Sequence, residues 1–151
     1  MKLSNKCRYG IRAVFDVEFH GKGRPARISE IAERQAIPPR FLEQIFQDLK
    51  RAGIVVSKRG PRGGYVLGRP AHAVSLGDIV YAVEGPLGIS DPDESMDCER
   101  TSSRTITKMV LAELSKRVEE CLNEVSIQAL CDRGNGTSHG PKGIPGYAYT
   151  I

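Results

Sequence analysis

Four cysteines are the residues of this 151-residue sequence that could bind a metal or undergo redox chemistry, and they stand far apart at Cys7, Cys98, Cys121 and Cys131. A chain of this length can build an ordinary hydrophobic core without cross-links, so we interpret them as thiols or ligands rather than as structural disulfides. The sequence offers no paired nucleophile and general base, and no phosphate-binding loop before a helix. It therefore predicts a protein that is not an enzyme.

A group of polar side chains has the types and the spacing that read DNA bases. In the major groove, arginine pairs with guanine, glutamine with adenine, and glutamate with the amino group of cytosine. Such residues recur on one face of a helix predicted over 40–52, at Arg40, Glu43, Gln44 and Gln47. The other face is predicted to be a buried apolar stripe of Phe41, Leu42, Ile45, Phe46 and Leu49. The alternative is an ordinary surface helix.

A basic loop, RGPRGG, follows at 59–64 between two short β-branched or aromatic runs. This pattern predicts a β-hairpin, and arginines on a glycine-rich tip suit a narrow minor groove. The residues expected to contact DNA there are Lys58, Arg59, Gly60, Arg62, Gly63 and Gly64. The cations expected at phosphates, which orient a protein without reading sequence, are Lys2, Lys6, Arg8 and Arg69. The alternative is a solvated hairpin.

The elements that must position these residues follow from periodicity and from start and stop signals. We expect helices over 2–20, over 28–36 with Ser29 at the N-cap, over 40–52, from Ser75 to Gly85, and from about Ser103 to Asn123. The predicted fold is mostly α with a small β-hairpin, a winged helix-turn-helix domain followed by a long amphipathic helix. We divide the chain into a DNA-binding domain (1–85), an acidic loop (86–102), a long helix with a short return helix (103–131) and a flexible tail (132–151).

Charge is unevenly distributed between the two halves of the chain. Residues 1–70 hold 15 Lys and Arg against 6 Asp and Glu, whereas residues 71–151 hold 7 against 12. A basic half is typical of a surface that binds a polyanion such as nucleic acid. No apolar stretch approaches the ~20 residues that span a bilayer, and the first residues lack the apolar core of a signal peptide. We therefore expect a cytoplasmic protein with no membrane partner.

Several segments carry a resemblance to a known family. "MKLSNKCRYGIRAVFDV", "FLEQIFQDLKRAGIV", "RGPRGGYVLGRP" and "VSLGDIVYAVEGP" resemble the Rrf-type family of bacterial transcription regulators, over about residues 1–131. The resemblance implies a homodimer that binds a palindromic operator in double-stranded DNA. It also implies that 86–102 is a sensor-type loop and that 103–131 is a dimerisation helix with a short return helix. A lone protruding helix could not bury an apolar stripe, so the stripe on the helix from Ser103 fits a dimer independently. Its members are Ile106, Val110, Leu114, Val118 and Cys121.

Many members of that family hold a [2Fe–2S] cluster on three cysteines in the loop before the dimer helix. This sequence departs from the pattern, because Cys98 is the one cysteine in that loop. Cluster ligation needs about four soft or imidazole donors, so the sequence favours a protein without a cofactor. The alternative is a cluster with an atypical ligand set that includes Cys98 and Cys7. For Cys7 and Cys121 we favour packing as small apolar side chains.

The sequence finishes with "GYAYTI" after a stretch rich in glycine and proline. In the cluster-lacking branch of the family, the regulators of cysteine metabolism, a similar ending is associated with cysteine synthase (O-acetylserine sulfhydrylase), which binds C-termini that end in isoleucine. Tyr147, Tyr149 and Ile151 are therefore expected to bind that enzyme, or alternatively to fold back onto their own dimer. The resemblance implies a repressor of sulfur and cysteine metabolism. The alternatives are an iron–sulfur-responsive regulator and a regulatory subunit of an enzyme that does not bind DNA.

Overall fold

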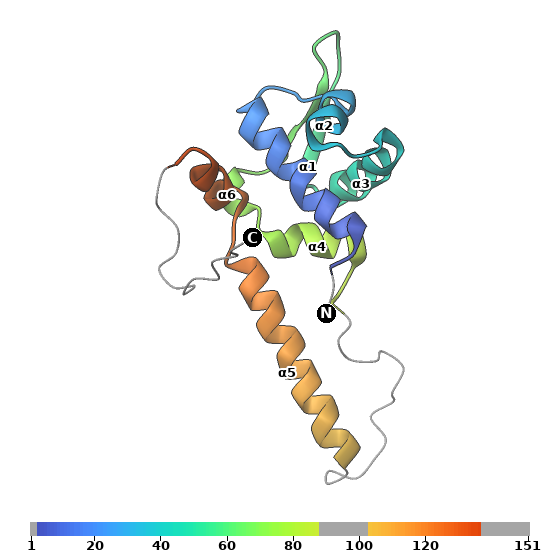
Figure 1. Cartoon of the computed structure of the whole chain (residues 1–151), viewed down its shortest axis with the longest axis vertical. Coiled ribbons are helices and arrows are strands. Elements are labelled where there is room, and N and C mark those ends of the chain that lie inside the picture. Colours follow the sequence, from blue (N-terminus) through green and yellow to red (C-terminus); the bar gives the residue numbers. More distant parts are fainter. Residues whose placement is uncertain (1–2, 88–102, 137–151) are drawn as a thin grey trace, which may run out of the picture.

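In the computed structural model, described over residues 3–87 and 103–136, the chain is mostly helical with one antiparallel hairpin (Figure 1). Ser4 caps the first helix, accepting from the backbone N–H of Cys7 at 3.1 Å. The elements in order are α1 (Asn5–Gly21), α2 (Ile28–Gln35), α3 (Pro39–Arg51), β1 (Val55–Lys58), β2 (Gly64–Leu67), η1 (Ala71–Ala73), α4 (Leu76–Glu84), α5 (Ser103–Asn123) and α6 (Ile127–Gly134).

The core lies where α1, α3 and α4 cross. Leu42, Ile45, Phe46 and Leu49 fill it from α3 and are fully buried. A Cβ atom built on Gly10 of α1 would lie 3.4 Å from methyl groups of both Ile79 and Val83. The absence of a side chain at Gly10 therefore lets α1 pack closely on α4.

The hairpin is joined to the helices by an isolated β-bridge. β1 pairs with β2 from Val55↔Leu67 to Lys58↔Gly64, and Ala26, just before α2, bridges Tyr65. Both backbone hydrogen bonds of that bridge are present, at 2.9 Å from Ala26 N and 2.8 Å from Tyr65 N. The hairpin is thus a wing attached to the start of α2.

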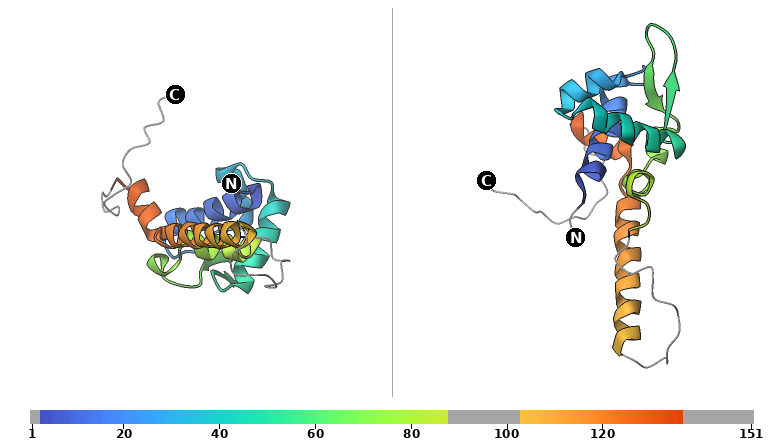
Figure 2. Two further views of the ribbon diagram at one scale, coloured as in Figure 1. Left: turned by 90° about the horizontal axis from the view of Figure 1, so that it is seen from below. Right: turned by 90° about the vertical axis from the view of Figure 1, so that its right-hand side faces the viewer.

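Helix α5 projects away from the rest of the described molecule, and the wing points to the opposite end (Figures 1 and 2). The base of α5 is held where the segment before α4 meets the segment before α6. Leu76 N donates to Val125 O and Ile127 N donates to Val74 O, each at 2.9 Å. Away from this base, apolar side chains of α5 such as Ile106 and Val110 are exposed to solvent.

The fold class predicted from the sequence is confirmed, and four details of the prediction are wrong. Helix α2 begins at Ile28 with Arg27 as its N-cap residue, so Ser29 does not cap it. Phe41 is 49% exposed, outside the buried stripe of α3, because its ring packs edge-on against Tyr9 rather than into the core. Helix α1 starts three residues later than expected, and α6 continues through Gly134 into the segment assigned to the tail.

Candidate nucleic-acid interface

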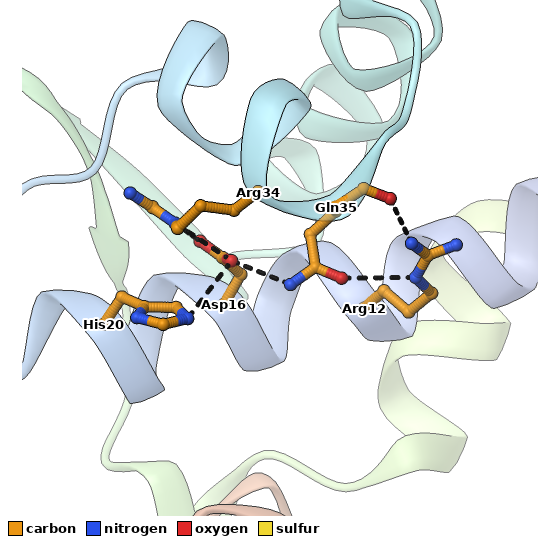
Figure 3. A network of polar contacts seen from close by, with 5 residues as sticks. All are labelled: Arg12, Asp16, His20, Arg34 and Gln35. Carbon is orange, nitrogen blue, oxygen red and sulfur yellow. Dashed lines mark hydrogen bonds and ion pairs between the residues drawn. The ribbon is translucent and has the colours of Figure 1, made fainter.

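A network of polar side chains fixes α2 against α1 (Figure 3). The carboxylate of Asp16 is fully buried and accepts from Arg34 Nη2 at 2.7 Å and from Gln35 Nε2 at 2.8 Å. Arg12 reaches the same Gln35 from α1, with Nε 3.2 Å from the amide oxygen. The hydrogen bond to Asp16 raises the pKa of Arg34 and so stabilises the charged guanidinium. The first helix of the helix-turn-helix pair is therefore held in one orientation.

The turn between α2 and α3 is set by its own backbone. Ala36 ends α2 in the left-handed region at φ 51°, and Ile37 is buried while its N–H donates to Ala32 O at 3.1 Å. Pro39 then occupies the first position of α3, where no N–H is needed. Tight anchoring of this turn fixes the angle between the two helices, on which major-groove docking depends.

The four residues predicted to read bases lie on the exposed face of α3. The buried residues of the helix occupy the opposite side. The four exposed residues are Arg40, Glu43, Gln44 and Gln47. Their donors and acceptors are at the surface, near the N-terminal end of the second helix of the pair. This is the arrangement that base-edge recognition in a major groove requires.

The wing presents its cations at the tip, and its glycines serve two purposes. Lys58, Arg59 and Arg62 are exposed. A Cβ atom on Gly63 would lie 2.4 Å from Lys58 O, and one on Gly64 would lie 2.5 Å from Ala26 O. These two half-buried glycines are needed for the close approach of protein backbone, whereas the exposed Gly60 turns the tip at φ 111°.

The cations expected to contact phosphates differ in the groups that they already bind within the protein. Lys6 is engaged within the protein, since Nζ lies 2.8 Å from Asp48 Oδ2 and 2.7 Å from Val83 O. Arg8 is exposed and donates to Asn5. Arg69 lies 3.6 Å from Asp78 Oδ2, and Lys2 lies outside the described residues. Arg8, which is exposed and bonded to a neighbouring side chain, is therefore more accessible to a phosphate than Lys6.

Sequence reasoning missed the basic segment that leads into α2. Lys22, Arg24 and Arg27 are exposed there, and Arg27 Nη2 donates to the carbonyl of Pro61 at the wing tip. The signal was present as three cations within "GKGRPAR". It was overlooked because that segment reads as a break between helices, and its proximity to the wing appears only in the fold.

A family model described as an iron-dependent transcriptional regulator, Rrf2, matches residues 3–133. The chain belongs to the Rrf2 family. It is 37% identical over 130 residues to the HTH-type transcriptional regulator IscR of Vibrio campbellii, a match that covers 86% of this chain and 77% of the relative. This Rrf2-family chain is thus a DNA-binding transcriptional regulator and not an enzyme, which confirms both predictions at that level.

Solved structures of Rrf2-type proteins share the fold. The structure of CymR, the global cysteine regulator of B. subtilis, matches with a TM-score of 0.72 and 30% identity, over 88% of this chain and 98% of that one. T. potens IscR matches with a TM-score of 0.74 and 30% identity, over 99% and 97%. Because these relatives are transcription regulators, an enzyme subunit that does not bind DNA is no longer a competing interpretation for this Rrf2-family protein.

The cysteines of this Rrf2-family chain do not converge within the described residues. Cys7 is fully buried, and burial, helped by Glu84, raises the pKa of its thiol to about 11. Burial likewise raises the pKa of Cys131 to about 11, while Cys121 is exposed on α5. Over 3–87 and 103–136, no group of three His, Cys, Asp or Glu could hold a metal ion. Cys98 lies outside the described part, and a protonated, buried Cys7 fits packing better than ligation.

The α5 helix of the Rrf2-family chain exposes the apolar side chains expected at a dimer interface. Ile106, Val110 and Leu114 are 58%, 59% and 47% exposed, whereas Val118 is half-buried nearer the base of the helix. Met109 and Leu111 extend the exposed apolar surface to either side. None of the described helices is long and apolar enough to span a membrane.

Proposed function

We propose that the protein is a homodimer that binds a palindromic operator, with α3 in the major groove and the wing in the adjacent minor groove. The observation that carries the proposal is the exposed row Arg40, Glu43, Gln44 and Gln47 on α3, beside a wing whose tip carries Arg59 and Arg62. The exposed apolar side chains of α5 support the dimer, because burying them against a second copy removes apolar surface from water.

We assign a different role to each successive segment of the chain. Residues 1–85 bind DNA, 103–131 dimerise through α5 with α6 returning to α1, and 86–102 and 132–151 receive signals. The latter two segments lie outside the described residues except for 86–87 and 132–136. Their assignment therefore rests on the sequence.

A fluorescence titration of the full-length protein with duplexes from the promoter beside its own gene tests the proposal. Specific binding should fall steeply as salt rises, because each neutralised phosphate adds about −0.9 to the slope of log K against log salt. A shuffled duplex of the same composition is the control. Equal affinity for both duplexes would contradict sequence-specific binding.

Replacing Glu43 by alanine is expected to relax the preference for one base pair by about 1–3 kcal/mol, because a carboxylate that accepts from cytosine N4 discriminates against the other bases. Competition titrations with duplexes that vary one position at a time measure this. Glu33→Ala removes an exposed glutamate from α2 and is the matched control. If both variants keep the wild-type base preference at every position, Glu43 does not read a base.

We also propose that the regulated genes serve sulfur and cysteine metabolism, that regulation is repression, and that Tyr147, Tyr149 and Ile151 bind cysteine synthase. Support comes from the single cysteine of the sensor-type loop, from the similarity to CymR, and from the aromatic, isoleucine-terminated segment itself. The segment lies outside the described residues. Recovery of cysteine synthase on immobilised protein should disappear when residues 147–151 are removed. Equal recovery with both forms, or none with either, argues against the partner.

The second candidate is a regulator that responds to iron or to an iron–sulfur cluster, with Cys98 and Cys7 among the ligands. The family model's description as iron-dependent and the similarity to IscR favour it. Anaerobic purification followed by an absorption spectrum distinguishes the two. A coloured protein that contains iron supports this candidate, and a colourless, iron-free one eliminates it.

A further inference from the structure

The tip of the wing is joined to the start of α2 by the side chain of Arg27. Its guanidinium donates to the carbonyl of Pro61, in the middle of the loop that carries Arg59 and Arg62. We propose that Arg27 is a positioning residue for DNA binding, which holds the wing-tip arginines in the orientation that DNA requires. This inference rests on the proposed function, because it assigns Arg27 a part in the placement of that wing.

The backbone of Arg27 is itself held in place. Its N–H donates to Glu30 Oε2 at 3.1 Å, and its carbonyl accepts from Ile31 N at 3.1 Å in the first turn of α2. Its neighbour Ala26 is bridged to Tyr65 of the wing. Arg27 therefore starts from a point that is rigid relative to both the helix pair and the base of the wing.

The loop that Arg27 reaches needs such support. It connects Lys58 to Gly64 through a tip that contains two further glycines, and glycine gives a backbone many accessible conformations. Within the tip, Gly63 N donates to Gly60 O at 2.9 Å, which closes the turn without joining it to the helices. A hydrogen bond from Arg27 restricts the loop before DNA arrives, and preorganisation of this kind raises affinity by reducing the entropy lost on binding.

Positive charge is concentrated around the wing-tip loop that Arg27 contacts. A groove of about 590 Å³ lies between the wing and the segment before α2, and Lys58, Arg59 and Arg62 are among its lining residues. Mutual repulsion among these cations favours a splayed loop. The guanidinium of Arg27 adds a further positive charge, but its charge-assisted hydrogen bond to the Pro61 carbonyl opposes that opening.

The test separates positioning from direct contact with DNA. Full-length wild type, Arg27→Ala, Arg59→Ala/Arg62→Ala and the triple variant are titrated with a labelled duplex selected from random sequences by the wild-type protein. Arg24→Ala is the matched control for the lost charge, since it removes an exposed cation from the same segment, and any loss of affinity that it causes should be the same with and without Arg59 and Arg62. Arg27→Ala should weaken binding about three- to tenfold, the effect of one hydrogen bond. The same change should have no further effect once Arg59 and Arg62 are absent, because coupled residues are not additive.

Hydrogen exchange of the free protein gives a second readout that does not depend on DNA. Amides of the wing-tip loop, 59–64, should exchange faster in Arg27→Ala and at the wild-type rate in Arg24→Ala, with unchanged melting temperatures for both. An equal loss of affinity in both backgrounds would show that Arg27 touches DNA itself and would overturn the proposal, as would unchanged exchange in the loop. Wild-type affinity of Arg59→Ala/Arg62→Ala overturns the wing's role in the proposed function, and that of Arg27 with it.

Discussion

Replacing Val110 by glutamate is expected to leave the protein monomeric and to weaken operator binding by about a hundred- to ten-thousandfold. Val110 is 59% exposed in the middle of the apolar stripe of α5. A carboxylate there would lose its water on association with a second copy, and burying a charge among apolar side chains is costly. In the proposed complex each subunit binds one half-site, so a monomer would lose the effective concentration that links the two binding events, which is worth about that factor.

Ala112→Glu is the matched control for this prediction. Ala112 is also exposed and lies on α5 two residues further along, so its side chain points to the other side of the helix. Sedimentation equilibrium gives the oligomeric state, and titration with full and half operators gives the affinity. The two variants should differ in both measurements while their helical content matches that of the wild type. A dimeric Val110→Glu variant, or an equally monomeric Ala112→Glu variant, would place the dimer interface elsewhere.

Elements with strong local signals were predictable from the sequence. Helix α4 lies between the predicted Ser75 and Gly85, because Ser75 accepts from Asp78 N at 3.0 Å and Gly85 ends the helix. Helix α5 has the predicted bounds, Ser103–Asn123. In both cases the information lies within a few neighbouring residues, as capping and periodicity require.

What the sequence did not reveal depends on contacts between distant segments. Helix α2 starts at Ile28 because Ala26 is held by Tyr65 of the wing, 39 residues further on, so local preference for Ser29 as a cap was overridden. Lys6 was expected to contact a phosphate, but in the fold its ammonium group binds Asp48 and the carbonyl of Val83. The exposure of the α3 residues proposed to contact DNA was predictable from helical periodicity. The hydrogen bond between Arg27 and the wing was not predictable in this way.

Asp16 illustrates the same limit. In the sequence it is one of two acidic residues in a basic helix, and in the fold it is the fully buried acceptor that joins α1 to α2 (Figure 3). Its oxygens accept from Arg34 and Gln35, and His20 Nε2 lies 3.8 Å away. A buried carboxylate is tolerated when its lone pairs are satisfied and a cation is close.

Asp16→Ala is therefore expected to reduce the free energy of unfolding by roughly 2–4 kcal/mol, less than for a wholly buried pair because the side chain of Arg34 is 33% exposed. The substitution leaves the donors of Arg34 and Gln35 without their acceptor and releases α2 from α1. Urea denaturation at one fixed protomer concentration measures the change, since the stability of a dimer depends on concentration.

A double-mutant cycle with Arg34→Met shows whether the loss comes from this pair. Arg34→Met alone leaves a buried carboxylate without its cation, and it should destabilise the protein by a similar amount. Asp16→Ala and Arg34→Met together should cost clearly less than the sum of the single changes, because each removes the same interaction. Additive losses, or a loss below about 0.5 kcal/mol for Asp16→Ala, a value typical of surface substitutions, would mean that packing of the helices, rather than this buried network, sets the orientation of α2.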